Sequence, residues 1–145
     1  MSFTIEGVNK PRRELYNLWF RLNFNQTIPR RIHAAVQISR NGEVVGMAWF
    51  PKEPIDRRIG MIINSTKPVW YNETNLKEIF DWSFDNLDAD VIYVEIESNN
   101  VASIKACQRF ARILPCIKTT GWSGGILQVL NYHLTREDYK EYCFG

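Results

Sequence analysis

The sequence predicts a mixed α/β domain with a mostly antiparallel sheet of six or seven strands flanked by helices. The chain has 145 residues, 45% of them hydrophobic, which is enough for one packed core. Short apolar runs of strand length alternate with segments whose apolar residues recur every three or four positions. One such helical segment separates two apolar strands, and this order implies a right-handed crossover and a parallel pair within the sheet. We therefore expect a single domain over residues 1–145.

The first elements follow from the capping residues and the spacing of apolar side chains. Phe3–Val8 has the length and character of a strand. Asn9 caps free amides and Pro11 tolerates the first turn, so a helix is predicted to begin there. Its apolar face comprises Leu15, Leu18, Trp19 and Leu22. A polar connection over residues 23–31 follows, for which both a loop and a second short helix remain open.

A hairpin and a fourth strand come next. Ile32–Ser39 and Glu43–Phe50 are strand-like, and Asn41-Gly42 between them favours the left-handed torsions of a tight turn. After a loop with two prolines, Ile59–Asn64 is predicted as one short apolar strand. These strands are thus assigned before the crossover helix.

The crossover helix and the segment after it are defined by asparagine caps. Asn72 is predicted to cap a helix, and Val91–Ile96 is a buried strand that follows it. The apolar face of that helix comprises Leu76, Ile79, Phe80, Phe84 and Leu87. Asn99 or Asn100 then caps another helix, which Pro115 ends. One face of this helix carries Ile104, Cys107, Ala111 and Leu114.

The last elements are a second hairpin and a short helix. Cys116–Trp122 and Ile126–Leu134 are predicted strands around a turn that contains two glycines. Thr135–Tyr142 is predicted to form one or two helical turns, with Thr135 as the cap.

Composition excludes several classes of protein. Eighteen basic and sixteen acidic residues give a net charge of +2, and the arginine doublets are scattered, so we do not expect a nucleic-acid partner. Three cysteines without CxxC spacing and two isolated histidines predict reduced thiols and no metal site. No apolar run approaches the roughly 20 residues that span a bilayer. We expect a cytoplasmic protein without a membrane partner.

The stretch around Val94-Glu95-Ile96 resembles the GCN5-related N-acetyltransferase (GNAT) superfamily, whose members transfer an acetyl group from acetyl-CoA to an amine. In that family a strand with a Leu-Glu-Val-like pattern leads to an asparagine five residues after the glutamate, as Asn100 follows Glu95 here. Ser103 matches a small residue of the next helix, whereas Cys107 stands where a tyrosine is often found and Ala111 where a glycine is. The order of elements resembles the family over essentially the whole chain.

The resemblance implies a GNAT-like fold in which the parallel fourth and fifth strands splay apart and the pantetheine arm of acetyl-CoA, the cosubstrate, pairs between them. It implies a direct transfer to an amine that the sequence does not identify. The implied catalytic residues are Glu95 as the base and Cys107 in place of the tyrosine that protonates the departing thiolate. The implied cofactor-binding residues are Ile62, Ile63, Asn64, Asn72, Asn100 and Ser103.

Each role has an alternative that the sequence leaves open. Glu95 also fits a solvated strand face, and Cys107 fits a small buried apolar residue. Tyr93 or Tyr132 is an alternative source of a hydroxyl group. Ser103 fits either a helix cap or a contact to the arm.

The sequence departs from the family pattern at one loop. Family members usually hold the pyrophosphate of the cofactor with a glycine-rich loop after the fourth strand, but no glycine occurs between Asn64 and Leu76. Small phage-encoded members have a similarly degenerate loop, which suggests a phage origin, with the host cytoplasm or the virion as the location. A second hypothesis is therefore a non-catalytic interaction or structural protein with the same fold, such as a phage component. The exposed edge of the final hairpin offers a pairing surface for a homodimer or another assembly partner.

Overall fold

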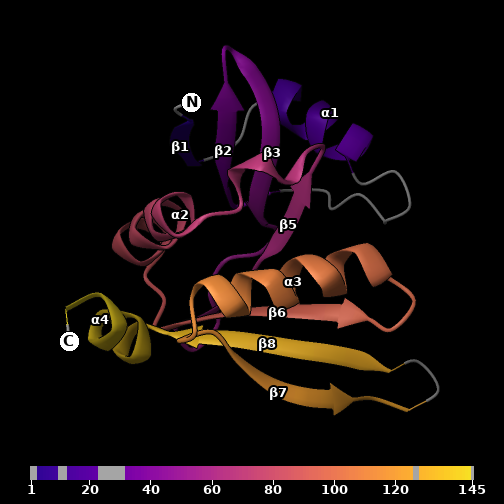
Figure 1. Ribbon diagram of the computed structural model, residues 1–145, viewed down its shortest axis with the longest axis vertical. Coiled ribbons are helices and arrows are strands. Elements are labelled where there is room, and N and C mark those ends of the chain that lie inside the picture. Colours follow the sequence, from indigo (N-terminus) through magenta and orange to yellow (C-terminus); the bar gives the residue numbers. More distant parts are fainter. Residues whose placement is uncertain (1–2, 10–12, 23–31, 126–127, 145) are drawn as a thin grey trace.

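The computed structural model describes residues 3–9, 13–22, 32–125 and 128–144 (Figure 1). Its elements in chain order are β1 Thr4–Asn9, α1 Arg13–Leu22, β2 Ala34–Arg40, β3 Glu43–Phe50, β4 Arg58–Gly60, β5 Ile62–Ser65, the 3-10 turn η1 Pro68–Trp70, α2 Glu73–Asn86, β6 Val91–Glu97, α3 Val101–Ile113, β7 Lys118–Ser123, β8 Val129–Thr135 and α4 Arg136–Phe144. This succession confirms the predicted order of helices and strands except that the run predicted as one strand over Ile59–Asn64 forms two, β4 and β5. The predicted helix start at Pro11, the connection over 23–31 and the start of the last strand at Ile126 lie outside the described residues.

The strands form two four-stranded sheets. The N-terminal sheet has the order β1-β2-β3-β5 and is antiparallel throughout. The C-terminal sheet has the order β4-β6-β8-β7, and β4 and β6 form its parallel pair. Figure 1 shows β2, β3 and β5 of the N-terminal sheet above β6, β8 and β7 of the C-terminal sheet.

The prediction of one strand over Ile59–Asn64 was wrong, because this run belongs to both sheets. β4 pairs with the start of β6, whereas β5 turns away and pairs with β3 from Trp49 to Gly46. Met61 lies between them and belongs to neither strand. The sequence does not reveal the break. The apolar residues on either side of Met61 are buried or half-buried in a strand, so the two strands have the same apolar pattern as one continuous strand.

Local signals for turns and caps were confirmed. Asn41 and Gly42 have φ values of 54° and 78°, the left-handed pair that joins β2 to β3. The Asn72 side chain accepts a hydrogen bond from the Asn75 amide at 2.9 Å, and Thr135 Oγ1 accepts one from the Asp138 amide at 3.0 Å. The side chains of these residues therefore fix the start of α2 and α4.

The main core lies between the two sheets and helices α2, α3 and α4. All five residues predicted for the apolar face of α2 are buried in it. On α3, Cys107 and Leu114 are buried as predicted, and so is Phe110, which the sequence pattern had not singled out. A smaller cluster beneath α1 contains Trp19, Ile32, Ala35, Met47 and Trp49.

A group of ion pairs joins the ends of three elements. Arg57 contacts Asp88 and Asp90, and Arg136 contacts Asp90. Arg136 also donates hydrogen bonds of 2.7 Å to the carbonyls of Phe84 and Ala89. The start of α4 is thereby tied to the end of α2 and the start of β6.

Among the described residues no helix has both the length and the apolar character needed to cross a bilayer.

Candidate functional site

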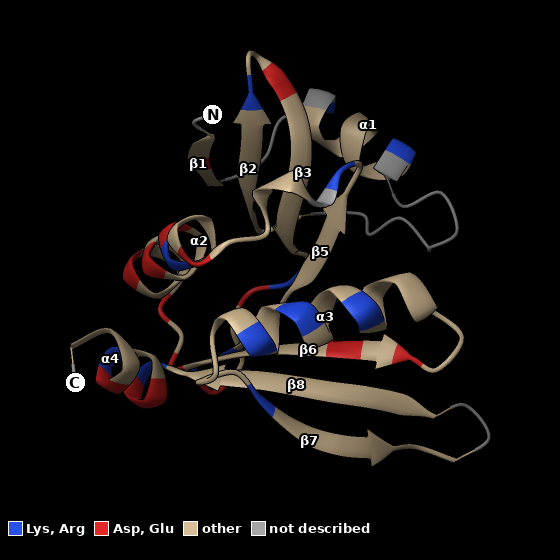
Figure 2. Cartoon of the chain, viewed as in Figure 1, with Lys and Arg blue, Asp and Glu red and all other residues tan. Residues whose placement is uncertain are grey.

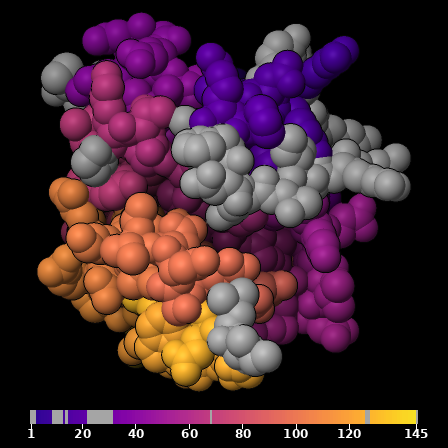
Figure 3. Space-filling view, turned by 90° about the vertical axis from the view of Figure 1, so that its right-hand side faces the viewer, coloured from indigo at the N-terminus to yellow at the C-terminus, as the bar shows by residue number. Residues whose placement is uncertain are grey.

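A groove opens between β5 and β6 because the two strands follow different sheets. The last hydrogen bond between the diverging segments runs from the Met61 amide to the Tyr93 carbonyl at 2.9 Å. Beyond it, residues 61–63 and 94–97 face each other across a space of about 400 Å³. Figure 3 views the molecule from this side and shows a recess bordered below by the orange surface of β6 and α3. We call this space the β5–β6 groove.

Helix α3 supplies the third wall of the groove. Asn100 caps it by accepting a hydrogen bond from the Ser103 amide at 3.3 Å. Ser103, Ala106, Cys107 and Phe110 follow one another on the face that lines the groove. Three of these four side chains are small, so the helix lies close to the strands without filling the space between them.

The structure brings most of the predicted site residues together. The lining of the groove includes Ile62, Ile63, Glu95, Asn100, Ser103 and Cys107. Asn64 is not part of this lining; it lies opposite Met47 in the register of β5 and β3. Asn72 is not part of it either, because its side chain serves as the cap of α2.

Glu95 lies where two hollows share a wall. It is exposed on β6, whose next residue Ile96 is buried in the core. Besides the groove, it lines a second hollow of about 530 Å³, which we call the Tyr93 hollow. The remaining lining of that hollow comprises Ile55, Asp56, Arg58, Tyr93, Thr120, Asn131, Tyr132 and His133. A ligand in either space can therefore reach the Glu95 carboxylate.

Cys107 is a buried thiol. Burial raises its pKa to about 12, so it is neutral at physiological pH. It also lines a small apolar cavity beside the groove together with Tyr132, whose pKa is raised by burial and by the nearby Cys107. Tyr93, the other tyrosine considered, lies below the Arg58 guanidinium, which is 5.8 Å from its ring centroid.

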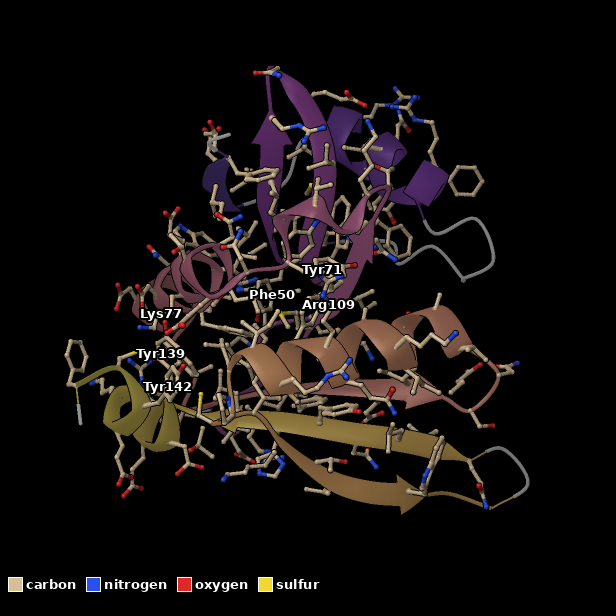
Figure 4. All side chains as sticks on the ribbon, in the orientation of Figure 1. Phe50, Tyr71, Lys77, Arg109, Tyr139 and Tyr142 are labelled. Atoms are coloured by element: carbon tan, nitrogen blue, oxygen red, sulfur yellow. The ribbon has the colours of Figure 1, made fainter. Side chains whose placement is uncertain are left out.

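Sequence reasoning missed Tyr71, which packs against Phe110 of the groove lining. Its ring lies 4.7 Å from that of Phe110 and 4.6 Å from that of Trp70, both edge-on. Burial raises the pKa of the Tyr71 hydroxyl, while a hydrogen bond with Ser65 acts in the opposite sense. Figure 4 shows Tyr71 and Arg109 side by side between η1 and α3. The aromatic pair directly before the capping residue Asn72 was the available signal.

Trp70 anchors the loop that carries Tyr71. It is fully buried, and its Nε1 donates a hydrogen bond to Ser65 Oγ at 2.8 Å. Gly46 on β3 leaves room for the indole, since a Cβ there would lie 2.5 Å from Nε1. A large side chain thus occupies the loop in which the resemblance had led us to look for glycines.

The first turn of α2 carries negative charge. Glu73 accepts a hydrogen bond from the Tyr142 hydroxyl at 3.1 Å and lies 3.4 Å from Lys77 Nζ. The Asn75 amide is already bonded to the Asn72 side chain. This helix start is consequently a poor site for an anion.

Within the described part of the chain, no three acidic, histidine or cysteine side chains gather as metal ligands.

No protein-family model matches the chain, and no curated protein matches its sequence. Solved structures do match. The spermidine/spermine N-acetyltransferase SpeG from Vibrio cholerae, in mutant forms, superimposes with a TM-score of 0.67 at 13% identity, over 97% of this chain and 98% of that one. The aminoglycoside acetyltransferase AAC(6')-Ib, in complex with coenzyme A and kanamycin, superimposes with a TM-score of 0.65 at 12% identity, over 97% of this chain and 98% of that one.

A third structure is that of yncA, a putative acetyltransferase from Salmonella typhimurium, with its cofactor acetyl-CoA. It matches with a TM-score of 0.60 at 15% identity, over 93% of this chain and 94% of that one. Because the alignments cover almost the full length of both chains, the chain has the GNAT fold. At these identities the likeness concerns the fold, and the chemistry has to be argued from the site.

Proposed function

We propose that this protein is an N-acetyltransferase that moves the acetyl group of acetyl-CoA directly to an amine. The β5–β6 groove carries the proposal. It opens where the run of chain that pairs with β6 in β4 leaves that strand and continues as β5, and its lining includes the residues Glu95, Asn100 and Ser103 of the sequence pattern.

The pantetheine arm is the part of the cofactor that suits this groove. β5 pairs with β3 along one edge, so its other edge, at Ile62 and Ile63, faces the groove. An arm that contains amide groups can bond to such an edge as an added strand would. Asn100 and Ser103 offer further polar contacts on the α3 side. Asn64 and Asn72 have no place in this arrangement as direct contacts.

Glu95 is the proposed base. From the wall shared by the two hollows, its carboxylate can take a proton from an ammonium group that enters through the Tyr93 hollow. The neutral nitrogen then attacks the thioester carbonyl, the C–N bond forms, and the C–S bond breaks. The nitrogen then loses its second proton, which passes to the departing thiolate, so that CoA leaves as a thiol and the product is a neutral amide. Cys107 stands in the groove wall, but burial raises the pKa of its thiol to about 12, so it is a poor proton donor to that thiolate.

The acceptor is proposed to be a primary amine that carries positive charge. The Tyr93 hollow contains the carboxylates of Asp56 and Glu95 against one arginine, Arg58. The similar proteins named above include a spermidine/spermine acetyltransferase and an aminoglycoside acetyltransferase, which supply the first compounds to try. Free thiols at Cys107, Cys116 and Cys143 fit the proposed cytoplasmic location. Phage origin and a homodimer stay predictions.

The test measures cofactor binding and acetyl transfer in the same preparation. Ligand at about 100 times its dissociation constant should stabilise the protein by about 2.7 kcal/mol, visible as a rise in melting temperature. Spermidine, kanamycin and simple primary amines are then screened for release of the CoA thiol. The variant Glu95→Gln should bind acetyl-CoA as the wild type does and turn over about 100-fold more slowly. Glu6→Gln, an exposed glutamate on β1, is the control.

Two outcomes would contradict the proposal, one in full and one in part. An unchanged melting temperature at millimolar acetyl-CoA would favour the non-catalytic alternative, in which the fold serves an interaction. Undiminished turnover of Glu95→Gln would remove the base role from this residue while leaving the transfer reaction in place.

A further inference from the structure

The phosphates of a CoA cofactor need a binding group outside the loop that usually holds them. The segment between β5 and α2 contains no glycine, and Trp70 and Tyr71 fill it with aromatic side chains. The start of α2 is occupied by the Asn72 cap and by the Glu73 carboxylate. Bare amides and a positive helix end, which bind phosphate elsewhere, are therefore lacking in this described segment.

Arg109 precedes Phe110 of the groove lining and lies over the ring of Tyr71. Its guanidinium carbon is 5.3 Å from the centroid of the Tyr71 ring, and that ring packs at 4.7 Å against Phe110, which lines the groove. An arginine stacked on an aromatic face keeps its in-plane N–H groups free to donate. The positive charge thus lies against the Tyr71 ring, between η1 and α3 (Figure 4).

Arg109 belongs to a basic face of α3. Lys105 and Arg112 stand four residues before it and three after it, so the three side chains share one side of the helix, and all are exposed. The sequence of α3 contains no acidic residue. Across the described residues, no carboxylate lies within ion-pair distance of these three, whereas Arg57, Lys77 and Arg136 are all paired. Figure 2 shows the blue positions succeeding one another along α3.

We propose that Arg109, supported by Lys105 and Arg112, binds the phosphate groups of CoA in place of a glycine-rich loop, and that Tyr71 positions the Arg109 guanidinium. Planar guanidinium groups bind phosphate oxygens through two parallel N–H donors. The site would select a thioester that carries a phosphorylated nucleotide over the same thioester without one. This inference rests on the proposed function, since it concerns the other end of the same cofactor.

The experiment compares acetyl-CoA with S-acetylpantetheine, which has the thioester and the arm but no phosphate. Arg109→Gln should weaken acetyl-CoA binding about tenfold or more and leave S-acetylpantetheine binding within about twofold of wild type. Tyr71→Leu removes the platform but keeps the charge, and it should cause a smaller loss for acetyl-CoA alone. Arg40→Gln is the matched control, because Arg40 also lies over an aromatic ring, Phe3, at 5.8 Å, but on β2.

The outcomes separate this inference from the proposed function. If wild type binds acetyl-CoA and Arg109→Gln binds it equally well, the phosphate site is wrong and the transferase proposal stands. If Arg109→Gln weakens both ligands to the same extent, Arg109 supports the groove rather than the phosphates, and the inference again fails. If wild type binds neither ligand, both proposals fall together.

Discussion

Cys107 replaces the tyrosine that resembling proteins often use as an acid, and its surroundings argue against the same task. The thiol is 7% exposed and its pKa is raised to about 12 by burial. An ordinary thiol has a pKa of about 8.5, so a proton moving from Cys107 to a CoA thiolate would go uphill by roughly 4 to 5 kcal/mol. This cost makes Cys107 a weak proton donor and an effective small apolar wall.

The first prediction at this scale concerns substitution of Cys107. Cys107→Ala should keep turnover within a few-fold of wild type and lower the free energy of unfolding by about 1 kcal/mol, because a buried sulfur is lost. Turnover against pH and urea unfolding measure the two effects. Cys143→Ala, a partly exposed thiol on α4, serves as the comparison. A hundredfold fall in turnover with loss of the alkaline limb would instead assign the acid role to Cys107.

Residues were predictable where a short motif fixes their spacing. Glu95, Asn100, Ser103 and Cys107 fall within thirteen positions of the sequence, and all four line the groove. Tyr71 lies outside this run, because its proximity to Phe110 depends on the packing of η1 against α3. A contact between elements distant in the sequence has no local pattern from which to predict it.

At the scale of elements, the loop before α2 depends on a close approach between an indole and a strand. Trp70 packs where Gly46 of β3 lacks a side chain, and the neighbouring Ser65 accepts its N–H. Gly46 and Ser65 are also register partners in β3 and β5. β5 therefore lines the groove and, together with β3, fixes the loop that carries Tyr71.

Gly46→Ala is predicted to destabilise the protein by about 2 kcal/mol or more, since the new Cβ would lie 2.5 Å from Trp70 Nε1 in a fully buried site. Urea unfolding followed by tryptophan fluorescence measures the loss. Gly125→Ala has nothing within 4 Å of the added Cβ and should change the free energy of unfolding little. Equal stabilities of the two variants would show that the indole can shift at low cost.

At the scale of the whole molecule, the order of helices and strands along the chain was easier to predict than the division of the strands into two sheets. The parallel pair was inferred from a helix between two apolar strands, and β4 and β6 confirm it. The change of pairing strand at Met61 could not be inferred from the sequence. It depends on whether the edge of β3 or that of β6 lies next to each residue of the run. Two twisted sheets that share one run of chain are a property of the assembled fold.

Stability of the whole fold should depend on pH through the ion pairs around Asp90. A hydrogen bond from Arg57, and then Arg136, lowers the pKa of the Asp90 carboxyl. A carboxyl with a lowered pKa in the folded state stabilises that state above its unfolded pKa of about 3.9, and the contribution is lost as pH falls through the folded value. The free energy of unfolding should accordingly fall between neutral pH and pH values below about 4.

Asp90→Asn should flatten this decline, and the difference between wild type and variant should be largest at neutral pH. Urea unfolding at a series of pH values gives both curves. Asp85→Asn is the control, because Asp85 and Asp90 line one surface hollow but Asp85 has no ion pair among the described residues. Parallel curves for wild type and Asp90→Asn would contradict the assignment.

The switch of partners at Met61 has a mechanical consequence. β4 and β5 are joined through Met61, but their hydrogen bonds belong to two different sheets, which diverge from that residue. A pantetheine arm that formed hydrogen bonds with both β5 and β6 would connect the two sheets. The amide hydrogens of the two sheets would then exchange as one cooperative unit instead of two. In such a protein the cosubstrate would be a component of the architecture as well as a reactant.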